Sequence, residues 1–154
     1  MTVRIREIVE RDRAAWVRMR DALWPGSRWD HEVETKKYFE TRGDRPIVFV
    51  AETDAGLIGF LELDFRKYAP DCLSSPVPFI EGWYVEPAWQ RRGVGRALVA
   101  AAEARAIEMG HTEIASDVEL DNAGSIAAHL ALGYEEVERT VAFRRVLCAM
   151  TDSR

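Results

Sequence analysis

Residues 85–96 read VEPAWQRRGVGR and reveal more about the architecture of this chain than any other segment. A β-rich run over residues 79–85 comes first, and the proline two positions later ends it. Downstream, apolar residues recur at helical spacing, at Leu98, Val99, Ala102, Ala106 and Met109. Gly110 stands where the C-cap of a helix is expected. The segment is therefore predicted to join a strand to a helix over about 94–109 through a short loop.

The loop itself has the composition of an anion-binding site. Gly93 and Gly95 allow backbone N–H groups to approach an anion, and the start of a helix adds unpaired donors and a positive dipole end. Arg91, Arg92 and Arg96 surround these glycines. A dinucleotide fingerprint would need a third small residue further on, and a Walker loop would need Lys-Ser or Lys-Thr. Two interpretations stay open: a phosphate cradle, or glycines that only turn the chain beside solvated arginines.

The rest of the sequence predicts a mixed α/β (α+β) domain. Residues 47–52 and 57–65 are β-rich runs on either side of a four-residue turn, which indicates an antiparallel hairpin. Further strands are expected near residues 3–8, 113–117, 134–138 and 141–146, and further helices over 12–23, from a cap at Asp30, and over 122–132. We expect one domain over residues 1–150, with a mostly antiparallel mixed sheet of about seven strands, about four flanking helices, and a frayed tail at 151–154.

Composition and charge disfavour several classes of protein. The 154 residues carry 21 Lys and Arg against 26 Asp and Glu, a net charge of -5, which disfavours a nucleic-acid binder. The first ten residues alternate apolar and charged positions, unlike a signal peptide, and no run is long enough for a membrane span. Cys72 and Cys148 match neither a metal-ligand spacing nor a disulfide framework. A cytoplasmic protein without a metal or a membrane partner is expected.

The loop motif also resembles that of a known family. Gln90-x-x-Gly93-x-Gly95 at the start of a long helix, with the later Asn122 and the turn at 132–134, is similar to the coenzyme A signature of the GCN5-related N-acetyltransferases. The resemblance implies acetyl-CoA as cosubstrate. It implies that the residues binding it are Trp83, Tyr84 and Val85 for the pantetheine arm, Arg91, Arg92, Gly93, Val94, Gly95 and Arg96 for the pyrophosphate, and Asn122 beside the thiol.

A second resemblance concerns the acceptor. The segments 23–26, 68–82, 115–117 and 132–139 are similar to the short aminoglycoside 6'-N-acetyltransferases. This resemblance implies a polycationic aminoglycoside as partner and a homodimer. The implied substrate-binding residues are Trp24, Ser27, Tyr68, Glu81, Asp117 and Glu138, of which Ser27 departs from the ring-bearing polar residue of that group.

Charge patterning supports a cationic acceptor independently. Between Asp117 and Glu138 there are six acidic residues and no Lys or Arg. Such a run is also typical of a solvated face, which is the alternative for its middle members. Trp24 and Tyr68 have the alternative of packing, although either ring is suited to stack on a sugar or an amine.

The mechanism implied by the family is direct attack of an amine on the thioester. Glu81, just before the pantetheine strand, is the candidate base, or else only an anchor for the ammonium. The Val85 N–H is implied as the oxyanion donor. His129 stands where many family members have a tyrosine that protonates the thiolate, and a structural histidine is the alternative. Acetylation of another cationic amine, or a non-catalytic sensor of acetyl-CoA, also remains open.

Overall fold

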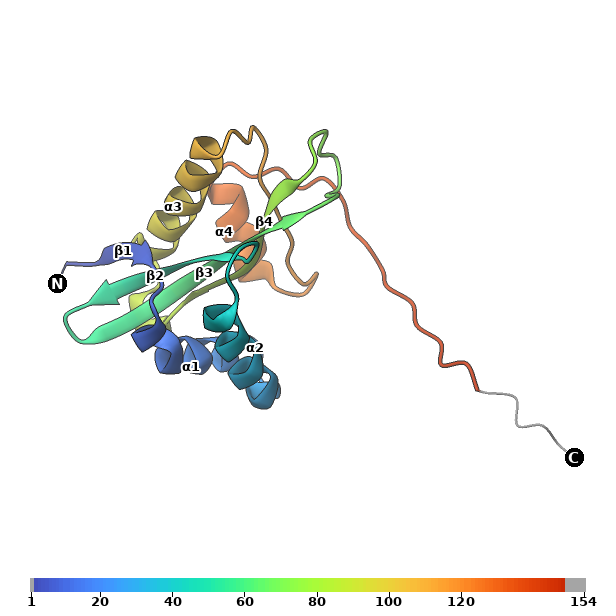
Figure 1. The fold of residues 1–154 in the computed structure, drawn as a ribbon. Coiled ribbons are helices and arrows are strands. Elements are labelled where there is room, and N and C mark those ends of the chain that lie inside the picture. Colours follow the sequence, from blue (N-terminus) through green and yellow to red (C-terminus); the bar gives the residue numbers. More distant parts are fainter. Residues whose placement is uncertain (1, 149–154) are drawn as a thin grey trace, which may run out of the picture. The chain divides into compact units, whose positions relative to one another are not determined.

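The computed structural model describes residues 2–148 and divides into two compact units, Met1–Glu119 and Leu120–Arg154 (Figure 1). No helix among the described residues has the length and apolarity that a membrane crossing requires. The elements of the first unit, in chain order, are β1 (Arg4–Glu7), η1 (Glu10–Asp12), α1 (Arg13–Leu23), α2 (Arg28–Glu40), β2 (Ile47–Thr53), β3 (Gly56–Arg66), β4 (Val77–Val85), η2 (Pro87–Trp89), α3 (Val94–Glu108) and β5 (Ala115–Ser116). The second unit contains α4 (Ala123–Ala131).

The strands form one sheet in the order β1-β2-β3-β4-β5. All neighbours are antiparallel except β4 and β5, which are parallel. The predicted hairpin is present, with Ile47 opposite Leu63 and Thr53 opposite Gly56. The predicted class, a mixed and mostly antiparallel sheet with about four helices, is confirmed, although the described residues form five strands rather than about seven.

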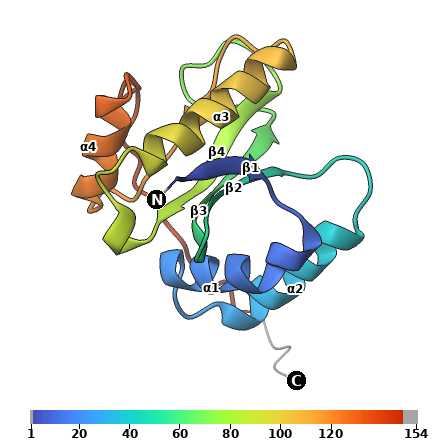
Figure 2. The ribbon, with the colours of Figure 1, turned by 90° about the vertical axis from the view of Figure 1, so that its left-hand side faces the viewer.

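Helices cover both faces of the sheet in the first unit. Figure 2 shows α1 and α2 together on one face and α3 on the opposite face. This sandwich explains why β3 is almost continuously apolar, since a strand covered on both sides has no solvent-facing row. Trp16, Val50 and Phe60 pack together under α1, and Leu98 is fully buried on α3.

The predicted stripe of α3 is confirmed for four of its five members. Leu98, Val99, Ala102 and Ala106 are buried, whereas Met109 is 50% exposed because the helix ends at Glu108. Gly110 then turns the chain with a φ of +89°, in the left-handed region that glycine tolerates.

The cap predicted for the second helix was wrong. The helix α2 begins three residues before its expected start, with Ser27 rather than Asp30 at the N-cap position, and it spans 13 residues. Strand β4 likewise begins at Val77, because its first residues extend the pairing with the end of β3 at Arg66.

The two predicted closing strands near 134–138 and 141–146 are absent from the described residues, which run from 133 to 148 without helix or strand. A strand needs a neighbour to bond its backbone groups, and no other described segment pairs with this one. Its apolar side chains stay exposed, Val141 by 71% and Phe143 by 93%. The predicted fraying at 151–154 lies outside the described residues.

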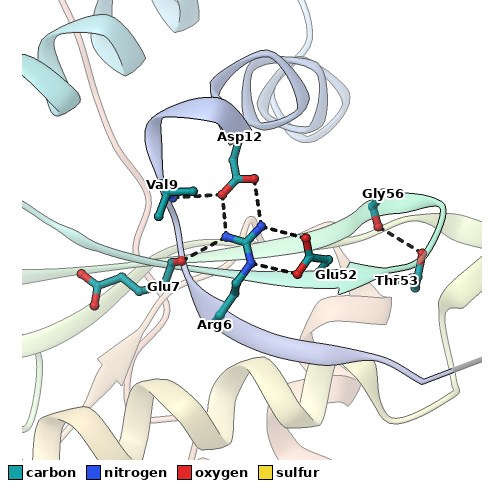
Figure 3. A network of polar contacts seen from close by, with 7 residues as sticks. All are labelled: Arg6, Glu7, Val9, Asp12, Glu52, Thr53 and Gly56. Atoms are coloured by element: carbon teal, nitrogen blue, oxygen red, sulfur yellow. Dashed lines mark hydrogen bonds and ion pairs between the residues drawn. The ribbon is translucent and has the colours of Figure 1, made fainter.

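A network of ion pairs and hydrogen bonds around Arg6 links β1 to η1 and β2 (Figure 3). The Arg6 guanidinium donates to both carboxylate oxygens of Asp12, at 2.6 and 2.9 Å, and to both of Glu52, at 2.9 and 3.0 Å. These bonds lower the pKa of the Asp12 carboxyl below its ordinary value and raise that of Arg6. β1, η1 and β2 are thereby linked through one side chain.

Candidate active site

The loop before α3 has the backbone of an anion cradle. Arg91 has a φ of +60° and Gly93 a φ of +81°, so the chain turns twice through the left-handed region within three residues. The Gln90 amide donates to the Val85 carbonyl at 3.0 Å and ties the loop to the end of β4. A loop of this kind presents successive N–H groups toward one point.

The start of α3 adds donors to this cradle. The N–H of Ala97 bonds the carbonyl of Gly93, so the N–H groups of the first turn have no acceptor within the helix. Gly93 is the N-cap residue and has no side chain to cover them. A Cβ on Gly95 would lie 3.0 Å from the Trp83 ring, which shows how closely the turn packs on β4. These features fit the pyrophosphate of coenzyme A.

Strand β4 is interrupted next to this loop. Ile80 pairs with Leu63 and Gly82 pairs with Glu62, which leaves Glu81 as an extra residue, a β-bulge. The parallel pairing with β5 ends at the same place, with Ile80 opposite Ser116. Among residues 2–148, β4 from Glu81 onward therefore has a paired neighbouring strand on one side only.

The side chain of Glu81 is held by an arginine. Arg66 donates to its two oxygens, each at 2.7 Å, and lies with its guanidinium carbon 3.5 Å from the centre of the Phe79 ring. The pairing raises the pKa of Arg66, and the nearby charge of Asp117 acts in the same direction. A carboxylate oxygen bound to one donor still has a free lone pair. Glu81 is thus fixed in position and able to accept from an ammonium or a water.

A pocket of about 470 Å³ lies beside Glu81. Trp24 forms part of its wall and packs directly on Gly82, where a Cβ would come within 2.6 Å of the indole. The lining carries four carboxylates against one arginine. The lining residues are Arg20, Trp24, Ser27, Asp30, His31, Glu34, Glu62 and Glu81.

Glu62 is the buried charge of this pocket. Its Oε1 accepts from the Trp16 indole N–H at 3.0 Å and lies 3.4 Å from the Nε of Arg20. Burial raises the pKa of the Glu62 carboxyl, while the charge of Arg20 opposes that shift. Arg20 also bonds Glu34 at 2.5 Å. The excess of carboxylates gives the pocket a negative potential suited to a cation.

The structure brings some predicted site residues together and leaves others apart. Trp24, Ser27 and Glu81 all line the pocket beside Glu81 described above. Tyr68 lies in the loop after β3, 72% exposed, and does not line that pocket.

Three further predicted residues, Asn122, His129 and Glu138, belong to the second unit. Asn122 caps α4, where its side-chain oxygen accepts from the Ser125 N–H at 3.1 Å. His129 Nδ1 lies 2.7 Å from the Ser125 carbonyl and therefore carries the hydrogen of that bond. Glu138 lies in the stretch without helix or strand.

Sequence reasoning did not predict five of the pocket residues as site residues: Arg20, Asp30, His31, Glu34 and Glu62. Glu62 had a detectable signal, since a carboxylate between Leu61 and Leu63 breaks an otherwise apolar strand. His31 and Glu34 had none, because α2 has no distinct apolar face that would show which side is buried. Among residues 2–148 no group of three His, Cys, Asp or Glu is placed to hold a metal ion.

Comparison with known proteins agrees with the fold and with this loop. Residues 16–134 match the model of the acetyltransferase (GNAT) family, and the chain belongs to that family. The matched residues include β4, the loop before α3 and α3 itself.

The similar proteins are more specific. The aminoglycoside N(6')-acetyltransferase type 1 of Klebsiella aerogenes is 42% identical over 146 residues, which is 93% of this chain and 96% of that protein. The enzyme of the same name from Stenotrophomonas maltophilia is 43% identical over 145 residues, 93% of each chain. Among solved structures, AAC(6')-Iy in complex with the bisubstrate analogue CoA-S-monomethyl-acetylneamine superposes with a TM-score of 0.87 at 34% identity, covering 96% of this chain and 100% of that one.

Proposed function

We propose that this protein transfers the acetyl group of acetyl-CoA to the 6'-amino group of aminoglycosides by direct attack of the amine on the thioester. The observation that carries the proposal is the acidic pocket, which meets the split strand β4 at Glu81, four residues before the end of that strand at Val85. The relatives named above acetylate this position of aminoglycosides according to their names, over nearly the whole of both chains.

The charge of the pocket supports a polycationic acceptor. Asp30, Glu34, Glu62 and Glu81 outnumber the single Arg20 on its wall. At partly exposed sites a carboxylate near an ammonium contributes on the order of 1 to 4 kcal/mol, so several together distinguish a polycation from a neutral sugar. The negative charge of Asp117 also acts on Arg66, the ion-pair partner of Glu81. Tyr68 and Glu138 are proposed as further contacts from their match to the acceptor residues of the same enzymes.

The cosubstrate supplies the activated acetyl group and a thiolate leaving group. We assign its pyrophosphate to the N–H groups of residues 91–96 and its pantetheine arm to the backbone of residues 83–85, with Asn122 beside the thiol. The left-handed turn at Gly93 and the uncovered first turn of α3 support the first assignment. The end of the β4–β5 pairing supports the second.

The amine must lose a proton before it attacks, since alkyl ammonium groups have a pKa of about 10. Glu81 accepts that proton, directly or through water, because its carboxylate is fixed by Arg66 and faces the pocket. The Val85 N–H stabilises the oxyanion. His129 is the proposed proton donor to the thiolate; its Nδ1 hydrogen is engaged by Ser125, so donation has to come from Nε2 of the cationic form.

Three broader features belong to the same proposal. The protein acts in the cytoplasm as a single acetyltransferase domain over residues 1–150. It forms a homodimer in which the exposed segment 133–148 finds the backbone partner that the described chain does not offer it. The five exposed apolar side chains of that segment, Val137, Val141, Phe143, Val146 and Leu147, support an interface.

The decisive experiment measures thiol release from acetyl-CoA in the presence of kanamycin or tobramycin. Spermidine and an aminoglycoside with a 6'-hydroxyl group serve as controls. Turnover with the 6'-amino compounds and little with the controls is expected. Efficient acetylation of spermidine with inert aminoglycosides would assign the pocket to another amine, and binding of acetyl-CoA without thiol release for any amine would indicate a sensor.

A further inference from the structure

His31 is a buried histidine with one unused nitrogen in the wall of the acidic pocket. The residue is 4% exposed and lies in the first turn of α2. Its ring centre is 6.1 Å from that of Trp24, at an interplanar angle of 34°. Nδ1 is buried and has no hydrogen-bond partner among the described residues. The mechanism proposed above does not use this residue.

The other nitrogen fixes the tautomer. Nε2 lies 3.0 Å from the backbone carbonyl of Trp24. A carbonyl only accepts hydrogen bonds, so Nε2 carries the hydrogen and the Nδ1 of the neutral ring presents a lone pair. The contact with Trp24 also prevents the ring from turning Nδ1 away without losing that bond. The imidazole is therefore held as a single, oriented acceptor.

A buried acceptor without a donor is unfavourable, which makes its position in a ligand pocket informative. The Nε of Arg20, in the same pocket, makes no hydrogen bond among the described residues but forms an ion pair with Glu62 Oε1 at 3.4 Å. His31 and Glu62 line the same pocket and are close enough to interact electrostatically. A buried acceptor without a donor, in a pocket lined by four carboxylates, suits a molecule that carries ammonium and hydroxyl groups side by side.

We propose that His31 is a binding residue for the acceptor, whose ammonium or hydroxyl group donates a hydrogen bond to Nδ1 and so orients the molecule in the pocket. The inference rests on the proposed function, because it assumes that the pocket of Trp24 and Glu81 receives the acceptor. It adds a contact from α2 to the residues matched by resemblance, all of which lie on other segments or at the turn before α2.

The first test observes the nitrogen itself in the unaltered protein. With histidine labelled with ¹⁵N and coenzyme A bound, we expect addition of kanamycin to move the Nδ1 resonance of His31 upfield, as an imidazole nitrogen does when it accepts a hydrogen bond. The resonances of His111 should stay in place. An unmoved Nδ1 resonance at saturating kanamycin overturns the inference.

The second test uses a pair of variants. His31→Gln places an amide N–H near the position of Nε2 and removes the acceptor at Nδ1, whereas His31→Asn places a carbonyl oxygen near Nδ1 and loses the bond to Trp24. We expect His31→Gln to raise the KM for kanamycin by about 10- to 100-fold with little change in kcat, as for the loss of a hydrogen bond to a charged group. His31→Asn should recover part of that loss despite a lower Tm. His111→Gln is the matched control.

The results separate this inference from the proposed function. If kanamycin is acetylated but neither the Nδ1 resonance nor the KM of His31→Gln changes, the function stands and the role of His31 fails. If spermidine is the substrate instead, the function fails, and the same resonance and KM measured with spermidine decide the role of His31. Failure of both amines to bind overturns both.

Discussion

Two glutamates on neighbouring strands, Glu62 and Glu81, differ in burial and in hydrogen-bond partner. Glu62 is 8% exposed and bonded to an indole N–H, and burial raises the pKa of its carboxyl. Glu81, at the bulge of the next strand, has a side chain 30% exposed and paired with an arginine. Water and an incoming amine reach the second more readily than the first. This difference supports the proposed role of Glu81 in proton transfer rather than a role of Glu62.

Glu81→Gln is expected to lower kcat by about 10²- to 10³-fold, the usual contribution of a positioned base, with the Kd of coenzyme A unchanged. Glu86→Gln is the matched control, because Glu86 lies on the same chain segment and forms a comparable ion pair with Arg18, at 3.0 Å with its side chain 32% exposed. Steady-state acetylation of kanamycin measures both. A raised KM with an unchanged kcat would reduce Glu81 to an anchor.

Asp12 offers a test of stability and its pH dependence. Its side chain is 7% exposed, and its pKa is lowered from the ordinary value of 3.8, chiefly by the hydrogen bonds from Arg6. A lowered folded-state pKa stabilises the fold above the ordinary value, and that contribution is lost as the pH falls through the folded value. Asp12→Asn should cost about 2 to 3 kcal/mol at pH 7.

Urea unfolding of both proteins between pH 2.5 and 7 checks this expectation. The difference in unfolding free energy should be constant above about pH 5 and shrink below about pH 4, where Asp12 becomes protonated. Glu40→Gln, which removes an exposed 3.9 Å pair with Lys36, should change nothing measurable. A difference between wild type and Asp12→Asn that persists at pH 2.5 would exclude the carboxylate as its source.

At the scale of elements, the junction of β4 and α3 joins the two halves of the proposed chemistry. The bulge at Glu81 ends the pairing with β5, and the left-handed turns at Arg91 and Gly93 start α3 with its donors uncovered. Both are features of backbone conformation rather than of side chains. Backbone changes at this junction should therefore affect binding of the cosubstrate more than they affect folding.

Gly93→Ala is expected to weaken the binding of coenzyme A by about tenfold, because a Cβ in the left-handed region costs on the order of 1 to 2 kcal/mol and the loop relaxes away from its cradle shape. Nothing lies within 4 Å of that Cβ, so steric contact is not the cause. Gly56→Ala, at the hairpin turn with a φ of +127°, is the matched control. It should lower stability without changing the Kd measured by calorimetry; equal Kd values for both variants would contradict the cradle.

At the scale of the whole molecule, the segment 133–148 is unlike the rest of the described chain. It has no helix or strand, yet it carries Val141, Phe143 and Leu147 in an exposed position. Residues 141–146 were predicted as a strand from their composition, and a strand without a neighbour in its own chain is completed by a neighbour from another. A second copy of the chain is the neighbour that the proposed homodimer supplies.

Light scattering coupled to size-exclusion chromatography tests the proposed homodimer. The 17.5 kDa chain should elute with twice its mass, about 35 kDa, at micromolar concentration. Phe143→Asp should shift it to the monomer, whereas Ile107→Asp, which charges an exposed apolar site on α3, should keep the dimer. A wild-type monomer at every concentration up to 100 µM would refute the dimer.

The sequence by itself determined most of the local elements and the glycine-containing loop before α3. The apolar period of residues 98–106, the turn between β2 and β3, and the glycines before α3 are each encoded by neighbours along the chain, because local backbone preference and one-sided burial leave a pattern within a few residues. The same motif was enough to indicate the acetyltransferase family.

Only the tertiary structure decided which side chains share the pocket. The burial of Glu62, the free nitrogen of His31 and the extra residue at Glu81 each depend on contacts between different elements, so no local period reveals them. The prediction of two closing strands was wrong because composition favours β-structure there, whereas a strand also needs a partner strand to pair with. Propensity is a property of the segment, whereas burial and backbone pairing are properties of what folds against it.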